Sequence, residues 1–198
     1  MRIVVSQFVS LDGVVQAPGG AEEDTDGGFA HGGWSHAYFD PEMVGGFVDR
    51  AMKDTEALLF GRRTWRTMAA AWPERAGDPF ADRMNELPKY VVTRSLREEE
   101  LTWGNTVRIP GGEVLERVRE LRERPGGDVQ VMGSPTLART LITHGLFDEL
   151  RLMLMPVLLG GGKKLFPEDG AHHPLTLVSA ATNPAGTQLL VYQPADAA

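Results

Sequence analysis

Residues Gly133 to Leu137 combine a glycine turn, a hydroxyl group and the start of a helix, a pattern that can bind anions. A short alternating apolar run precedes them, and apolar residues at helical spacing follow. Gly133 permits the turn, Ser134 can cap the helix, and Pro135 suits its first turn because proline has no N–H to leave unpaired. Free N–H groups at a helix start attract phosphate. An ordinary strand-to-helix turn explains these residues about equally well, so two readings stay open: a plain turn, or a phosphate site made of Gly133, Ser134, Pro135, Thr136 and Leu137.

Two further segments repeat this order of strand, turn and helix. A strand predicted at Glu56 to Phe60 runs into Gly61-Arg62-Arg63-Thr64-Trp65, and a strand predicted at Lys89 to Thr93 runs into Arg94 and Ser95. Guanidinium groups hold phosphate oxygens bidentately, so arginines beside a helix start strengthen an anion site. The additional candidates for phosphate binding are Gly61, Arg62, Arg63, Thr64, Thr93, Arg94 and Ser95.

These turns meet only if a sheet brings the strand ends to one edge. Ile3 to Val9 is predicted as the first strand and ends in the turn Ser10-Leu11-Asp12-Gly13, followed by a polar, glycine-rich loop that is typical of a lid or a mobile segment. A helix is predicted from Asp40, with a cap, a proline and the early acid Glu42. The later elements are a strand at Thr106 to Ile109, a helix at Glu113 to Arg124, a strand-like run at Phe147 to Leu159, and a hairpin of Leu175 to Ala180 with Gln188 to Gln193. We expect an α/β sheet with an antiparallel edge.

The composition narrows the class of protein. The 198 residues are 42% hydrophobic, enough for the core of one domain, residues 1–198. A net charge of -7 argues against a nucleic-acid partner, and no apolar run is long enough to span a membrane. Without cysteine there is no disulfide or thiolate chemistry, and without a signal-peptide pattern at the start we expect a cytoplasmic location. The zinc signature of nucleoside deaminases is missing, and we expect no metal site.

Taken together, the motifs resemble the dihydrofolate reductase superfamily, in particular the reductase domain of bifunctional riboflavin-biosynthesis enzymes. The resemblance covers nearly the whole chain, and it depends on the order and spacing of motifs that are weak one by one. They are Ser10-Leu11-Asp12-Gly13, Gly61-Arg62-Arg63-Thr64-Trp65, Val92-Thr93-Arg94-Ser95, Gly133-Ser134-Pro135-Thr136-Leu137, and Asp148-Glu149-Leu150 leading to Pro156-Val157-Leu158-Leu159-Gly160-Gly161-Gly162. The resemblance implies a dihydrofolate reductase-like single mixed sheet of about eight strands, with helices on both faces and a C-terminal antiparallel hairpin.

The resemblance also implies a function and site roles. The protein is expected to be an NADPH-dependent reductase of a small heterocyclic substrate, similar to 5-amino-6-(5-phosphoribosylamino)uracil reductase and to dihydrofolate reductase. Arg62, Arg63 and Thr64 are expected along the cofactor phosphates. Arg94 and Ser95, after Thr93, are expected at the adenosine 2′-phosphate. The pyrophosphate is expected at Gly133 to Leu137.

Catalytic roles follow the same resemblance. Asp12 and Gly13 are expected near the nicotinamide and the substrate, and Glu42 is the second candidate acid. Both acids have a plain alternative, because Asp-Gly is a common turn pair and Glu42 stands in the first turn of a helix.

Two positions depart from the riboflavin-pathway pattern. Met132 stands where an acid is expected, and Thr67-Met68-Ala69 replaces an Asp-Asn-Pro type segment. The substrate is therefore not identified. A non-catalytic nucleotide-binding protein and a purely structural α/β domain remain alternatives. A homodimer is expected because family members often pair and because Leu150 to Met155 carries apolar residues on both faces.

Overall fold

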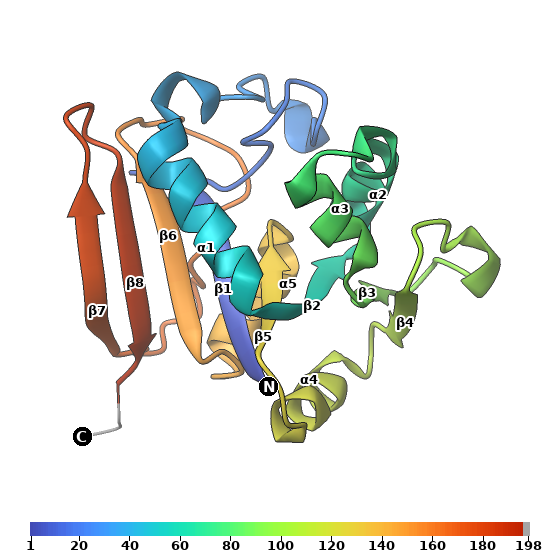
Figure 1. Cartoon of the computed structure of the whole chain (residues 1–198). Helices are drawn as coiled ribbons and strands as arrows, with labels where there is room; N and C mark the ends of the chain where they lie inside the picture. Colours follow the sequence, from blue (N-terminus) through green and yellow to red (C-terminus); the bar gives the residue numbers. More distant parts are fainter. Residues whose placement is uncertain (196–198) are drawn as a thin grey trace.

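Eight strands form one mixed sheet in a computed structural model that describes residues 1–195; the last three residues of the expected domain, 196–198, lie outside the described residues. The strands are β1 (Arg2–Ser10), β2 (Thr55–Gly61), β3 (Lys89–Thr93), β4 (Thr106–Pro110), β5 (Asp128–Met132), β6 (Glu149–Met155), β7 (Leu175–Thr182) and β8 (Gln188–Pro194). Their order across the sheet is β4-β3-β2-β5-β1-β6-β8-β7. The predicted single sheet of about eight strands is confirmed (Figure 1).

The pairs among strands β1 to β6 are parallel, and the two pairs that β8 makes are antiparallel. The pairs of β1 with β5 and β6, of β2 with β3 and β5, and of β3 with β4 are parallel, whereas β8 runs antiparallel to both β6 and β7. The predicted C-terminal hairpin is therefore confirmed. The carboxyl ends of parallel strands lie together at one end of the sheet, so the turns after β1, β2, β3 and β5 are neighbours there.

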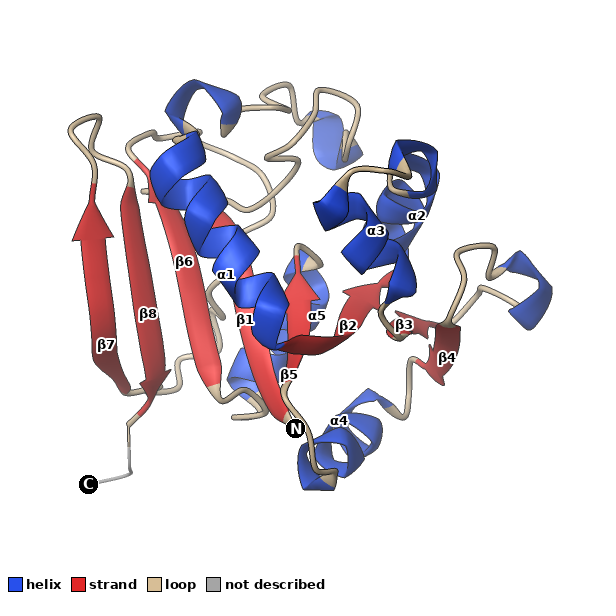
Figure 2. Ribbon diagram, in the orientation of Figure 1, coloured by secondary structure: helices blue, strands red, loops and turns tan. Residues whose placement is uncertain are grey.

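Helices cover both faces of this sheet, as expected. They are α1 (Gly46–Asp54), α2 (Arg62–Ala71), α3 (Pro79–Glu86), α4 (Val114–Glu123) and α5 (Pro135–Thr143). On one face the buried side chains of α1, α2 and α3 pack on β2 and β3, while on the other face α4 and α5 pack on β1, β2, β5 and β6 (Figure 2). Short helical turns complete the chain at Asp26–Gly28, His36–Tyr38, Pro41–Gly45, Pro73–Arg75 and Glu98–Glu100.

The helix predicted from Asp40 is present but begins as a π-helical turn. Asp40 caps it, since its Oδ1 accepts hydrogen bonds from the backbone N–H of Glu42 at 3.0 Å and of Met43 at 2.9 Å. The wide turn Pro41–Gly45 changes to regular α-helix at Gly46, where two adjacent glycines weaken helical structure.

One edge of the sheet is open. All eight residues of β7 are exposed, and in Figure 1 the β7–β8 hairpin stands beside the helices rather than beneath them. In contrast, β6 lies between β1 and β8 and most of its residues are buried. The apolar residues of Leu150 to Met155 thus serve the chain's own core, and the exposed apolar strand is β7.

Candidate functional site

The turns after β2 and β5 are joined to each other by hydrogen bonds. The Ser134 hydroxyl oxygen accepts a hydrogen bond from the Gly61 N–H at 2.9 Å, and the Ser134 N–H donates to Thr64 Oγ1 at 2.9 Å. The expectation that the Ser134 side chain caps its own helix is therefore wrong. Ser134 has a left-handed backbone (φ 56°), and its hydroxyl group serves the neighbouring turn instead.

A hollow of about 330 Å³ opens where these two helices begin, and we call it the two-helix hollow. Its lining is Asp24, Gly61, Arg62, Arg63, Thr64, Ser134, Pro135, Thr136, Leu137 and Lys163. The first N–H groups of a helix have no partner within the helix, and helix N-termini carry partial positive charge. Within residues 1–195, no hydrogen bond is recorded for the N–H groups of Thr136 and Leu137. Two helix N-termini and three cations thus surround one space that suits an anion.

Gly133 stands where a side chain would be strained. Its φ is +57°, and a Cβ atom there would lie 3.0 Å from Thr64 Cγ2. Its carbonyl oxygen accepts a hydrogen bond from Gln7 Nε2 at 2.6 Å. A glycine is favoured at this turn both by the backbone conformation and by the close approach of Thr64.

Acidic residues of the long loop after β1 already contact the cations of the two-helix hollow. Arg63 pairs with Asp24 and Asp26, and Lys163 Nζ contacts the same two carboxylates, at 3.0 Å for Asp26. Part of the positive charge is therefore neutralised by the chain itself. Lys163 had no role in the sequence analysis, because nothing in its local sequence indicates that it returns to this site.

Thr93, Arg94 and Ser95 lie farther along the same edge of the sheet. The end of β3 is adjacent to the end of β2, since Gly61 pairs with Val92. Thr93 Oγ1 accepts the N–H of Ser95 at 3.1 Å, and the Arg94 side chain lies close to Gly111 after β4. These residues neighbour the two-helix hollow without lining it.

Asp12 contacts a glycine loop rather than a hollow. Its carboxylate accepts hydrogen bonds from Ser10 Oγ at 2.6 Å, from Leu159 N at 3.2 Å and from Gly160 N at 2.8 Å. These hydrogen bonds, led by that of Ser10, lower the pKa of Asp12. Gly13 takes φ +83° in the same turn, and its carbonyl oxygen accepts the Leu165 N–H at 2.9 Å.

A second hollow, the aromatic cleft, lies between the sheet and helices α1 to α3, with a volume of about 570 Å³. Its aromatic lining consists of Phe8, Phe39, Phe47, Trp72 and Phe80. Gly133 also lines it, and a narrow hollow of about 30 Å³ shares Gly133 with the cleft and Ser134 with the two-helix hollow. The two large spaces are therefore neighbours across one turn.

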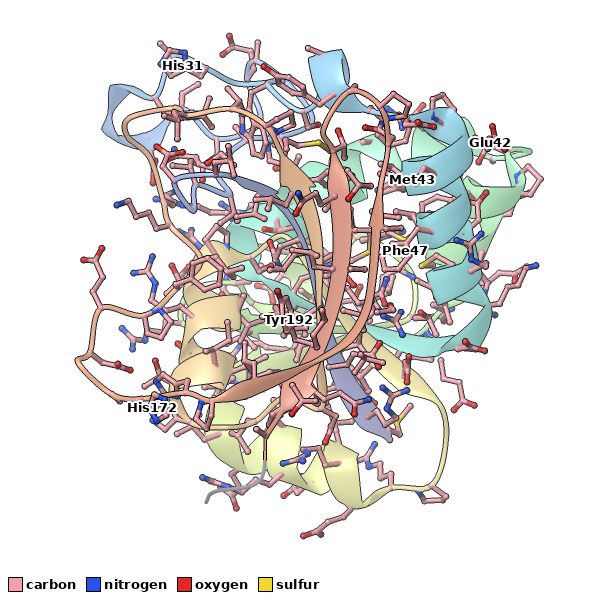
Figure 3. The ribbon with its side chains drawn as sticks, turned by 90° about the vertical axis from the view of Figure 1, so that its left-hand side faces the viewer. His31, Glu42, Met43, Phe47, His172 and Tyr192 are labelled. Carbon is pink, nitrogen blue, oxygen red and sulfur yellow. The ribbon has the colours of Figure 1, made fainter. Side chains whose placement is uncertain are left out.

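The acidic residues that line the aromatic cleft are not the predicted candidates Asp12 and Glu42. Glu42 is exposed on the outer side of its helical turn, whereas Met43 and Phe47 lie on the side facing the sheet (Figure 3). Glu23 and Asp49 line the cleft, and burial raises the pKa of Glu23. Sequence analysis missed both, because a loop acid and an acid on a helix give no local signal of this position.

The sheet contributes three further polar residues to the cleft that the sequence analysis did not identify. Ser6 and Gln7 line it from β1, and Gln130 lines it from β5. The sequence signal is weak, because other residues of these strands, such as Ser10 and Asp128, are polar too.

A larger hollow of about 640 Å³ lies between two loops, Asp26 to His31 and Leu159 to Lys163. Five of its twelve lining residues are glycines, and the other seven include Gln16, Asp26 and His31. Among the described residues, no group of three or more acidic or histidine side chains has a geometry for a metal ion, and no helix is long and apolar enough to cross a membrane.

Comparison with known proteins agrees with the resemblance found in the sequence. The profile of the RibD C-terminal domain family matches residues 2–189. An uncharacterized protein of Bacillus subtilis (strain 168), YyaP, is 29% identical over 196 residues, which is 96% of this chain and 94% of YyaP.

Solved structures share the fold at lower identity. A putative riboflavin biosynthesis protein from Shewanella sp. PV-4 has a TM-score of 0.70 at 18% identity, covering 98% of this chain and 99% of the other. A pyrimidine reductase-like protein from Corynebacterium diphtheriae has a TM-score of 0.64 at 13% identity, with 99% and 92% covered. Dihydrofolate reductase from Enterococcus faecalis, complexed with NADP(H) and RAB-propyl, has a TM-score of 0.60 at 14% identity, with 98% and 97% covered. The dihydrofolate reductase-like fold is thus shown.

Proposed function

Since the chain belongs to the RibD C-terminal domain family, we propose that it is an NADPH-dependent reductase of a small heterocyclic substrate. The observation that carries this proposal is the convergence of two helix N-termini on one hollow, next to an aromatic cleft. One space suits the phosphates of a dinucleotide, and the other suits a flat ring.

The residues around the two-helix hollow fit a nicotinamide dinucleotide. The N–H groups of Thr136 and Leu137 and the side chain of Arg62 would hold the pyrophosphate, and Gly133 keeps the turn free of side-chain atoms. Arg94 and Ser95, farther along the edge, would contact the adenosine 2′-phosphate. When bound, NADPH supplies the hydride, so the protein has to orient the substrate, exclude water and provide a proton.

The proton is assigned to Glu23. Asp12 and Glu42 are the acids that the family resemblance implies, but Glu23 lines both the aromatic cleft and the narrow hollow at Gly133. Because burial raises its pKa, Glu23 holds a proton more readily than an exposed carboxylate does. Direct catalytic roles for Asp12 and Glu42 stay predictions.

The test has two stages. Titration with NADPH, followed by nicotinamide fluorescence, asks whether the cofactor binds; absence of binding would overturn the proposal. Turnover is then measured as loss of NADPH absorbance with reducible pterins and pyrimidines. NADPH binding without turnover of any of these would favour the alternative, a non-catalytic nucleotide-binding protein.

We also propose that two copies of the protein form a homodimer through β7. This edge strand exposes Leu175, Leu177 and Val178, which are 38%, 52% and 52% exposed. In Figure 3 the hairpin faces the viewer, and Tyr192 is labelled on its strand β8. An apolar edge strand with free backbone groups favours pairing with a second copy. A cytoplasmic location stays a prediction from the sequence.

A further inference from the structure

Two buried polar atoms in the floor of the aromatic cleft have no hydrogen-bond partner among the described residues. They are Ser6 Oγ and Gln130 Oε1, on side chains of residues that are only 8% and 1% exposed. A buried polar atom without a partner destabilises the folded protein, and such atoms are uncommon in native proteins. Both residues line the cleft, so a molecule in the cleft can supply the missing partner.

The strand register puts the two side chains on the same face of the sheet. Val4 pairs with Gln130, and Ser6 pairs with Met132, two residues farther along each strand. Paired residues of parallel strands project to the same face, and so do residues two apart on one strand. Ser6 and Gln130 therefore project from adjacent strands toward the same side, beneath α1 to α3.

The walls of the cleft determine what else the molecule can carry. Five aromatic side chains favour a planar ring. The ionisable lining residues are Glu23, His36, Asp49 and Arg75, and the Arg75 guanidinium lies over the Trp72 ring at 4.9 Å. A phosphate group would bring further negative charge next to two carboxylates, with one arginine that already contacts an indole ring.

We propose that the aromatic cleft binds a neutral, planar nitrogen heterocycle without a phosphate group, and that Ser6 and Gln130 recognise its lactam edge. A lactam presents an N–H donor beside a carbonyl acceptor. The serine hydroxyl group both donates and accepts, and the glutamine amide offers one donor group and one acceptor, so the edge pairs with either orientation of the amide. This inference rests on the proposed function, because the heterocycle is the substrate of the proposed reductase.

The experiment measures ring binding by calorimetry without NADPH. The probes are pteridine-2,4-dione and its 1,3-dimethyl derivative, which keeps the ring but has no N–H. In wild-type protein, pteridine-2,4-dione should bind more tightly than the dimethyl derivative. Ser6→Ala and Gln130→Met should each weaken pteridine-2,4-dione binding roughly 3- to 10-fold, as the loss of one hydrogen bond does, and should not affect the dimethyl derivative. Equal binding of the two probes, no binding of either, or unchanged affinity in both variants would overturn the proposal.

A second pair of probes tests whether a phosphate group on the ligand improves its binding. Uridine should bind at least as tightly as uridine 5′-monophosphate; tighter binding of the monophosphate contradicts the proposal. The matched controls are Ser179→Ala on β7 and Gln193→Met on β8, which change the same residue types at exposed positions away from the cleft. Both controls should bind pteridine-2,4-dione like the wild type.

Unfolding in urea separates recognition from a structural role. Since Ser6 Oγ and Gln130 Oε1 have no protein partner, Ser6→Ala and Gln130→Met should unfold at a urea concentration no lower than wild type. A clear drop would mean that these atoms stabilise the fold and would count against recognition. The NADPH titration tests the proposed function separately. Ring binding that depends on Ser6 and Gln130 supports the inference even if NADPH does not bind, and that result would overturn only the proposed function.

Discussion

The hydroxyl oxygen of Ser134 accepts a hydrogen bond from the backbone N–H of Gly61 at 2.9 Å, although the two residues lie 73 positions apart. This bond fixes the start of α5 beside the start of α2. The proposed anion site needs the two helix starts held together, so the geometry of this contact determines the two-helix hollow.

Gly133 provides the first test of that site. Gly133→Ala adds a Cβ at 3.0 Å from Thr64 Cγ2 and forces a side chain into φ +57°, and we expect roughly a tenfold loss of NADPH affinity. Gly145→Ala is the matched control: Gly145 has φ +62° with nothing within 4 Å of an added Cβ. Both variants should lose about 1 kcal/mol of unfolding free energy, but only Gly133→Ala should bind NADPH more weakly. Equal NADPH affinity in the two would remove the turn from the cofactor site.

The preference for NADPH over NADH should depend on Arg94. A charge-assisted hydrogen bond to the 2′-phosphate contributes about 1.5 to 3 kcal/mol, so Arg94→Ala should lower the ratio of the two affinities roughly tenfold or more. Arg97→Ala, on an exposed arginine that pairs with Glu99 and Glu100, serves as the control. Dissociation constants for both cofactors in each variant decide the matter; a wild-type protein that binds them equally would refute the prediction.

Glu23 should control the pH dependence of turnover. A general acid works in its protonated form, so wild-type kcat/KM should fall as pH rises through the raised pKa of Glu23. Glu23→Gln should lower kcat/KM by roughly 10²-fold and remove this decrease with pH. Glu22→Gln, at the exposed neighbouring position, should keep the wild-type profile. An unchanged profile in Glu23→Gln would exclude Glu23 as the proton donor.

Asp12→Asn should affect stability more than binding. The amide keeps one acceptor oxygen but loses the charge that strengthens the hydrogen bonds from Leu159 and Gly160, so we expect a loss of about 1 kcal/mol at pH 7 and nearly unchanged NADPH affinity. The folded-state pKa of Asp12 lies below its unfolded value of about 4, so the carboxylate stabilises the fold above that pH. Denaturant titrations should show the wild type losing its advantage over the variant as pH falls below about 4. A 10²-fold loss of kcat/KM without loss of stability would instead assign Asp12 a catalytic role.

The dimer prediction concerns the edge strand β7. Leu177→Lys places a charge on the exposed apolar edge and should convert a dimer into the 21.6 kDa monomer in sedimentation equilibrium. Val107→Lys is the control, because Val107 is similarly exposed, 54%, on β4 at the opposite edge. A wild-type protein that sediments as a monomer at micromolar concentration would refute the dimer.

The strand and turn pattern could be predicted from sequence because its signals are local. Apolar alternation before Gly133 and the Arg62 turn after β2 indicated strand ends that parallel pairing then brings to one edge. Other features depend on partners distant in the chain. Asp12 accepts a hydrogen bond from Gly160, which lies 148 positions later in the chain. The unpartnered Oε1 atom of Gln130 can be recognised only once the fold shows that it is buried beneath the helices on one face of the sheet. The local sequence pattern does not indicate such long-range contacts. The sequence analysis therefore did not identify the acidic residues that line the aromatic cleft or the polar residues in its floor.

The place of β5 in the sheet has a consequence for how the protein is made. β5 lies between β1 and β2, and among the described residues the neighbours of β1 are β5 and β6, so β1 leaves the ribosome without a partner until residues 128 to 155 follow it. Such distant pairings slow folding, and at about 5 to 20 residues per second the wait lasts many seconds. When β5 inserts, it completes the centre of the sheet and delivers Ser134 to Gly61 in the same step. The proposed nucleotide site is therefore assembled by the event that closes the sheet, and we expect a nascent chain that has not finished folding to bind no NADPH.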